Sequence, residues 1–303
     1  MGQRKDSGRN RILVATDFSA RSERALRRAG MLARSMAGAL TVVHVVDDDR
    51  PGRIVELEVR EAGTLLEEQV GSLPELAGLA CRYEVVTGDP FDGILRAGAE
   101  TAADLIVMGS HRKHLLRDVF IGTTIERVVR RGPCPVLMVN SPAAGPYGSV
   151  LVPVDMSDAS ARALEAADGL GLLEDARVVV AHAFLAMATG PLYIADAPKE
   201  RIAAHVAEEQ RRADVELGAF LEANHVLDRD WQRHVREGDA LEVIGAAVET
   251  LRPDLVVVGT HGRSGIARIF LGSVTESLLR ALETDILAVP PRRPAGTGGD
   301  ARA

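Results

Sequence analysis

The chain has 303 residues, 46% of them hydrophobic, and a formal net charge of −7, which suits two soluble globular domains of about 150 residues each. The acidic balance argues against a dedicated nucleic-acid binder, which usually presents a basic face. No apolar run is long enough to span a bilayer, so no membrane partner is expected.

The compartment is inferred from the first residues and the cysteines. Residues 1–10 are polar and lack the apolar centre of a signal peptide. Cys81 and Cys134 lie in or beside apolar runs, with no His or Cys at ligand spacing. We therefore expect a cytoplasmic protein with two free buried thiols and no metal site.

The first half of the chain alternates short apolar runs with helical periods. Strands are predicted at 12–16, 40–46, 82–86, 105–108 and 136–139, and helices at 22–36, 54–70 and 91–102. Near-continuous Val, Ile and Leu strands alternating with helices are typical of a parallel sheet covered on both faces. Residues 1–141 are therefore predicted to form a doubly wound, five-stranded α/β domain.

The second half repeats the first. Residues 141–148 are rich in Pro and Gly, which break both periods, and are predicted to be a linker. Beyond them Asp17 recurs as Asp155 at an offset of 138, and Gly109 recurs as Gly259 at an offset of 150. The second copy therefore carries about 12 extra residues, much of which we place at 185–199. A second domain of the same kind is predicted over 149–291.

A carboxylate follows the first strand of each copy. In open α/β sheets, ligands bind beyond the carboxyl ends of the strands, where the winding direction switches. Asp17 and Asp155 stand at this point, and Ser19 and Ser157 follow as predicted helix N-caps. Two roles stay open for the aspartates: local turn and cap hydrogen bonding, or accepting hydrogen bonds from ribose hydroxyls or an exocyclic amine.

A glycine-rich loop follows the fourth strand of the second copy. It runs from Gly259 to Ser273, and a helical pattern begins immediately after it. A strand, a glycine loop and a helix start together form a phosphate cradle, because glycine permits positive φ and close approach and the helix start offers free N–H groups. The Ser273 hydroxyl and the N–H groups of Ser273, Val274 and Thr275 are expected to point at phosphate oxygens.

The loop matches neither of two common phosphate motifs. No Gly-Lys-Ser/Thr follows four spacers, as the Walker pattern requires, and the spacing is not G-x-G-x-x-G. His261 and Arg263 add polar or positive character, whereas Arg268 is either a ligand contact or a solvated surface charge.

The first copy departs from this loop. It keeps Gly109, Gly122 and Thr123, but Arg112 stands where the second copy has Gly262, and Leu115 where it has Gly265. A side chain at this position would obstruct the approach of phosphate, whereas an arginine could contact a phosphate oxygen itself. Phosphate binding at the first site is therefore left open.

The chain resembles the universal stress protein family, in its tandem, ATP-binding type. Three features carry the resemblance: a first strand followed by Asp, a second strand that contains His, and the motif Gly259, Gly262, Gly272 and Ser273. The resemblance covers nearly the whole chain, twice. It implies two sheets of strand order 3-2-1-4-5, the adenine nucleotide alpha hydrolase-like fold. It also implies ATP, with or without Mg²⁺, in the crevice between strands one and four.

The resemblance also implies the residues that hold the nucleotide. Asp155 would hold the ribose, and the backbone of Ala183 would meet the adenine. The second-domain set is Pro153, Asp155, Ala183, Gly259, His261, Gly262, Arg263, Gly265, Gly272, Ser273, Val274 and Thr275. The first-domain set is Ala15, Asp17, Val45, Gly109, Arg112, Gly122, Thr123 and Thr124.

Three classes of function are compatible with these features. No catalytic triad, metal cluster or carboxylate pair recurs, and His44 and His182 are interpreted as structural histidines. We therefore predict a non-catalytic, ATP-binding regulator or sensor of stress. The alternatives are a weak ATPase or autophosphorylating enzyme using Ser273 or Thr275, and an interaction module that needs no nucleotide.

Pairing is expected at two levels. In the family, the fifth strands, here 136–139 and 286–289, pair across domains and would make the two copies a pseudo-dimer. A homodimer of the tandem chain is also expected.

Overall fold

The computed structural model describes residues 10–110, 123–186, 198–226, 229–260 and 271–291 of the chain. The five strands predicted in the first half are confirmed to within one residue at each end, and the three helices to within two. The elements of the first copy are β1 (Arg11–Ala15), α1 (Ala20–Ser35), β2 (Ala39–Val46), α2 (Gly52–Ser72), η1 (Pro74–Leu76), β3 (Cys81–Thr87), α3 (Pro90–Glu100), β4 (Leu105–Gly109), α4 (Thr124–Arg131) and β5 (Val136–Val139).

The second copy repeats this order. Its elements are β6 (Ser149–Pro153), α5 (Asp158–Gly169), β7 (Arg177–Phe184), α7 (Lys199–Ala223), β8 (Gln232–Glu237), α8 (Ala240–Leu251), β9 (Leu255–Gly259), α9 (Ser273–Ala281) and β10 (Asp285–Val289). Much of the predicted insertion, residues 187–197, lies outside the described part of the chain.

The ten strands of the described residues form one sheet, in the order β3-β2-β1-β4-β5-β10-β9-β6-β7-β8. Within each copy the strands pair in parallel and follow the predicted order 3-2-1-4-5, which is confirmed. The copies meet where β5 and β10 pair antiparallel, with Leu137 opposite Leu287. The predicted pairing of the two fifth strands is therefore confirmed.

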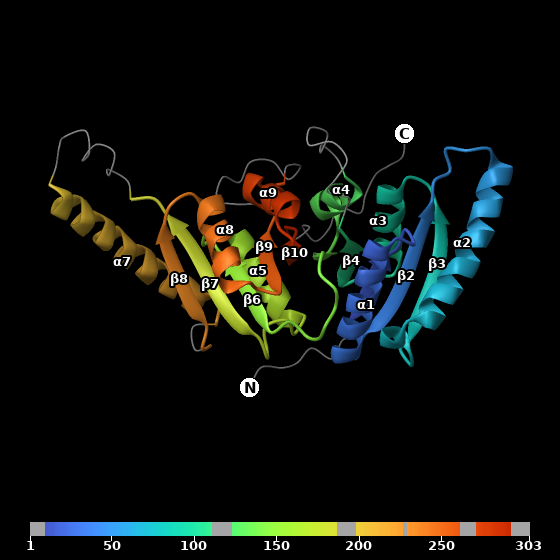
Figure 1. The fold of residues 1–303 in the computed structure, drawn as a ribbon, viewed down its shortest axis with the longest axis horizontal. Coiled ribbons are helices and arrows are strands. Elements are labelled where there is room, and N and C mark those ends of the chain that lie inside the picture. The colour runs from blue at the N-terminus through green and yellow to red at the C-terminus, as the bar shows by residue number, and fades with distance from the viewer. Residues whose placement is uncertain (1–9, 111–122, 187–197, 227–228, 261–270, 292–303) are drawn as a thin grey trace, which may run out of the picture.

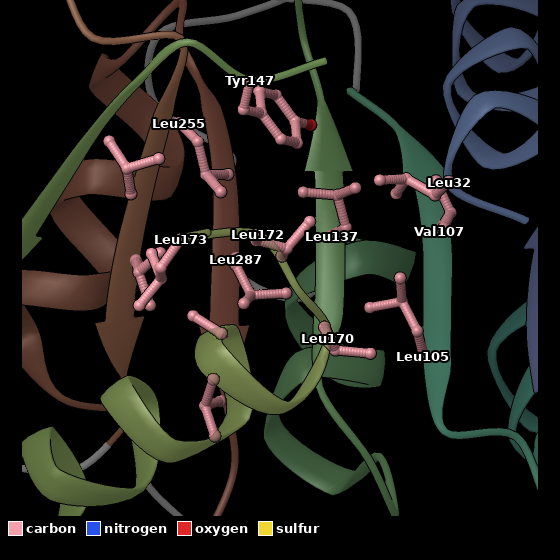
Figure 2. Packing of buried hydrophobic residues seen from close by; sticks show 14 of the residues in the cluster. Leu32, Leu105, Val107, Leu137, Tyr147, Leu170, Leu172, Leu173, Leu255 and Leu287 are labelled. Atoms are coloured by element: carbon pink, nitrogen blue, oxygen red, sulfur yellow. The ribbon is translucent and has the colours of Figure 1, made fainter. Parts of the chain in front are cut away.

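Helices cover both faces of the sheet (Figure 1). The core on one face includes side chains of α1, α2, α5 and α7, and the core on the other includes side chains of α3, α4, α8 and α9. Both cores continue from one copy into the other, since each contains residues of β5 and β10. Figure 2 shows Leu137 and Leu287 on neighbouring strands at this seam, with Leu170 and Leu172 close by.

A buried cluster of charged and polar groups holds the linker beside the β5–β10 seam. Asp285, fully buried at the start of β10, accepts hydrogen bonds from the N–H groups of Asn140 and Ser141 (both 2.9 Å) and from the Tyr147 hydroxyl (2.8 Å). The Arg28 guanidinium of α1 lies 3.5 Å from the same carboxylate and 4.1 Å from the centre of the Tyr147 ring. Three segments, α1, the linker and β10, are thus held at one point.

Within the described residues, none of the helices combines the length and apolarity needed to cross a membrane.

Candidate functional site

Each copy has a cavity beyond the carboxyl ends of its strands, where the sequence predicted a ligand. The first has a volume of about 530 Å³ and the second about 290 Å³. Each is lined by the carboxyl ends of the paired first and fourth strands of its copy, β1 and β4 or β6 and β9. This is the switch point of a doubly wound sheet.

The strand-end aspartates line these cavities and also hold the turn that follows. Asp17 accepts a hydrogen bond from the Ser19 N–H at 3.0 Å. Asp155 accepts from the N–H of Ser157 at 3.1 Å and from the hydroxyl of Ser160 at 2.7 Å. The local hydrogen-bonding role is therefore present, and the same carboxylates face the space that a ligand would occupy.

The charge of Asp17 is stabilised in place. Burial alone raises the pKa of this carboxyl, but hydrogen bonds involving Ser19 and Ser22 and the nearby Arg21 outweigh burial and lower the pKa. Asp17 is therefore ionised at neutral pH.

The predicted N-caps are confirmed in both copies. The Ser19 hydroxyl accepts from the Ser22 N–H, and the Ser157 hydroxyl accepts from the Ser160 N–H, both at 3.3 Å. Each cap begins the helix that forms one wall of its cavity.

The two strand histidines make contacts of the kind expected of structural histidines. Nδ1 of His44 lies 2.8 Å from the Thr16 carbonyl oxygen, and Nδ1 of His182 lies 2.8 Å from that of Val154. Each imidazole ties the second strand of its copy to the turn after the first strand. His44 nevertheless contributes to the wall of the first cavity.

Gly109 and Gly259 end the fourth strands at points of close backbone contact. Neither has a positive φ. A Cβ on Gly259 would lie 2.7 Å from the Ala159 carbonyl oxygen, and one on Gly109 would lie 2.6 Å from that of Arg21. Of the two properties of glycine considered above, close approach therefore applies at these two residues and positive φ does not: the strand end touches the first turn of α1 or α5.

The start of α9 forms the opposite wall of the second cavity. Gly272 precedes the helix with an ordinary φ of −58° and makes no side-chain cap hydrogen bond. Ser273 is exposed and lines the cavity. The Thr275 hydroxyl is buried and donates to the Gly259 carbonyl oxygen at 2.8 Å, which ties the helix start to the strand end.

The start of α4 in the first cavity is capped differently. The Thr123 side chain accepts a hydrogen bond from the Glu126 N–H at 3.3 Å. Both Thr123 and Thr124 line the cavity.

The structure therefore brings together the predicted residues that it describes. Those lining the second cavity are Pro153, Asp155, Ala183, Gly259, Gly272, Ser273, Val274 and Thr275. Those lining the first are Ala15, Asp17, Val45, Gly109, Thr123 and Thr124. His261, Gly262, Arg263, Gly265, Arg112 and Gly122 lie outside the described residues.

Sequence reasoning missed two groups of lining residues. One is the first turn of the first helix in each copy, which supplies Arg21 and Ser22 or Ser160. The other is the start of α3 or α8, with Ile94 or Ile244. The strand order of a doubly wound sheet could have predicted the second group. In that order the helix after the third strand packs beside the second strand and reaches the same end of the sheet.

The wall between the second strand and this helix is built in opposite ways in the two copies. In the first, Val45 of β2 faces Gly93, where a Cβ would lie 2.7 Å from the valine Cγ1. In the second, the matching residues are Ala183 and Val243, and both line the cavity. The larger side chain is on the strand in the first copy and on the helix in the second, so the two similar folds enclose cavities of different shape.

The cysteines form no part of either cavity. Cys81 and Cys134 are free thiols, and burial, with a smaller contribution from Asp104, raises the pKa of Cys134 to about 12. In the described part of the chain, no group of three or more His, Cys, Asp or Glu side chains could hold a metal ion.

Comparison with known proteins gives one family. The model described as "Universal stress protein family" matches residues 8–140 and 146–290. Universal stress protein Rv2005c of Mycobacterium tuberculosis is 26% identical over 305 residues, covering 91% of this chain and 95% of its own. Universal stress protein E of Escherichia coli is 27% identical over 226 residues, covering 71% and 70%.

Among solved structures, a universal stress protein from Archaeoglobus fulgidus superposes with a TM-score of 0.67 at 19% identity. The alignment covers 94% of this chain and 99% of that one. At this identity the likeness shows the shared fold.

Proposed function

The chain belongs to the universal stress protein family, and from that premise we propose that it is a stress-response regulator that binds ATP in the cavity of its second domain. The observation that carries the proposal is the position of α9. Its first residue lines a cavity whose other wall carries the strand-end carboxylate Asp155. An anion-binding helix start and a hydrogen-bond acceptor thus face the same space, as a nucleotide requires.

The start of α9 fits a phosphate group. The first N–H groups of a helix have no partner within the helix, and the dipole makes this end positive. Since Gly272 supplies no side-chain cap, phosphate oxygens would take the place that a capping side chain fills elsewhere. The exposed Ser273 hydroxyl adds a further donor.

The other wall fits a nucleoside. Asp155 can accept from ribose hydroxyls while it holds the turn before α5. Ala183 and Val243 offer an apolar surface for a flat base. The proposal covers ATP with or without Mg²⁺.

The polar groups around the cavity favour binding over catalysis. Efficient phosphoryl transfer needs a positioned base, but the His182 Nδ1 is engaged with the Val154 carbonyl. The Thr275 hydroxyl is engaged with Gly259. These contacts support a sensor that responds to occupancy, and we place it in the cytoplasm, which the free thiols support. The family resemblance supports pairing with a second copy of the chain.

Calorimetric titration with ATP tests the site through Gly272→Val. The backbone at Gly272 suits valine, because its φ is −58°, so the added side chain should act mainly by entering the cavity. We expect ATP affinity at this site to fall about tenfold or more. Gly63→Val in α2, where a Cβ meets nothing within 4 Å, is the matched control and should leave the affinity unchanged. Equal affinity of Gly272→Val and wild type would contradict the site.

A further inference from the structure

Among the described residues, the first helix of each copy brings a different charge to its cavity. Arg21, in the first turn of α1, lines the first cavity. At the offset of 138 its counterpart is Ala159 in α5. Of the residues described, those that line the second cavity include neither lysine nor arginine. The first helix therefore brings a positive charge to the first site and brings none to the second.

Arg21 and Ala159 occupy equivalent places beside the glycine that ends the fourth strand of their copy. The two backbones lie alike, since the carbonyl oxygens of Arg21 and Ala159 stand 2.6 and 2.7 Å from a Cβ built on Gly109 and Gly259. Ala159 nevertheless does not line its cavity. Only the first copy therefore carries a basic side chain at this place in its first helix, beside its cavity.

This guanidinium is also without a protein partner among the residues that the structure describes. Arg27 and Arg28 of α1 are engaged: Arg27 pairs with Glu75 at 2.9 Å, and Arg28 donates to the Gly145 carbonyl oxygen at 2.6 Å. The buried Nε of Arg24 has no hydrogen-bond partner among the described residues, but Arg24 does not line the cavity. Arg21 makes no comparable hydrogen bond or ion pair with the described residues. Its electrostatic effect is felt at Asp17, whose pKa it helps to lower.

We propose that Arg21 binds phosphate in the first domain, and that it makes this site selective for adenine nucleotides with two or more phosphates. Arg21 of α1 and Thr124, the first residue of α4, both line the first cavity. One phosphate meets the N–H groups at the start of α4, and a further phosphate meets the guanidinium, whose planar fork suits phosphate oxygens. The inference rests on the proposed function, since it takes the ligand to be an adenine nucleotide.

The test compares ATP with AMP at the first site alone. Ser273→Glu in the full-length chain places a negative charge at the start of α9, which suits the helix but repels phosphate from the second cavity. In this background, calorimetry should give an affinity for ATP about tenfold or more above that for AMP. Adding Arg21→Ala or the size-conserving Arg21→Gln should abolish the preference and leave AMP affinity nearly unchanged.

The control is Arg53→Ala, which removes the same charge from an exposed position in α2 that does not line the cavity. It should keep the preference for ATP. A preference that survives both Arg21 variants would overturn the inference. Binding of one ATP by the wild type with none left in Ser273→Glu would also overturn it while the proposed function stands. A wild-type chain that binds no nucleotide would overturn both.

Discussion

The absence of a single Cβ atom sets how closely a strand end and a helix approach beside the second cavity. Gly259 ends β9 against the backbone of Ala159, and its missing Cβ is what permits the contact. Because both groups in that contact are backbone, neither can move aside without shifting a strand or a helix. The glycine therefore fixes the distance between the carboxyl end of β9 and the helix α5 that follows Asp155.

Gly259→Ala should destabilise the chain for this reason. The new methyl group would lie 2.7 Å from the Ala159 carbonyl oxygen, and relieving such overpacking costs about 1–3 kcal/mol. Gly245→Ala, in α8 with nothing within 4 Å of the new Cβ, should instead stabilise by about 0.5–1 kcal/mol, because alanine favours the helix. Urea denaturation measures both changes, and equal effects of the two substitutions would refute the close-contact role of Gly259.

At the scale of residues, the sequence predicted which residues line the second cavity better than it predicted the contacts that explain them. The pattern of Asp155, Gly259 and Ser273 predicted residues that line one cavity. It did not predict that Gly259 faces Ala159, since that contact joins residues 100 apart in the chain. Arg21 was missed because nothing in its local sequence separates a cavity arginine from an exposed one.

At the scale of elements, the pairing of β5 with β10 joins the two copies. β5 is four residues long, and its hydrophobic residues are buried on both faces of the sheet. Apolar runs predicted both strands, and the family resemblance predicted their pairing. The register could not be predicted, because a short run of Val, Leu and Met offers no mark that distinguishes one alignment from the next.

Either half expressed alone should self-associate through its fifth strand. Residues 1–141 would expose the edge of β5 together with the apolar side chains that now meet β10, and an unpaired apolar edge favours strand pairing. Residues 149–291 should behave alike through β10. Sedimentation equilibrium gives the masses, and a monodisperse single half would show that this edge does not drive association.

At the scale of the whole molecule, the linker breaks the symmetry of the duplication. The cluster of Arg28, Tyr147 and Asp285 has no counterpart on the other side of the seam, where the matching positions hold Ala166 and Pro135. The offsets of 138 and 150 revealed the duplication. The cluster was beyond sequence reasoning, because it joins three segments far apart in the chain.

Tyr147 should make stability depend on pH in alkaline solution. Burial first, and then the neighbouring Asp285, raise the pKa of Tyr147 well above its usual 10.0. The unfolded chain therefore loses this proton at a lower pH than the folded chain, so the stability that the phenol contributes is present below pH 10 and is lost as the pH rises further.

Tyr147→Phe should lower the free energy of unfolding by about 1–2 kcal/mol at neutral pH, through the lost hydrogen bond. It should also flatten the fall in stability above pH 10. Urea denaturation between neutral and alkaline pH measures both effects. Tyr83→Phe removes an exposed hydroxyl and should leave the slope unchanged. Parallel pH curves for Tyr147→Phe and wild type would contradict the role of the buried phenol.

The number of ATP molecules bound per chain, measured by calorimetric titration, shows whether nucleotide binds at both helix starts. We expect two per wild-type chain, one in each cavity. Ser273→Glu at the start of α9 should leave one, and Thr124→Glu at the start of α4 should also leave one. A wild-type chain that binds no ATP, or that binds two in spite of Ser273→Glu, would contradict the placement of nucleotide at these helix starts.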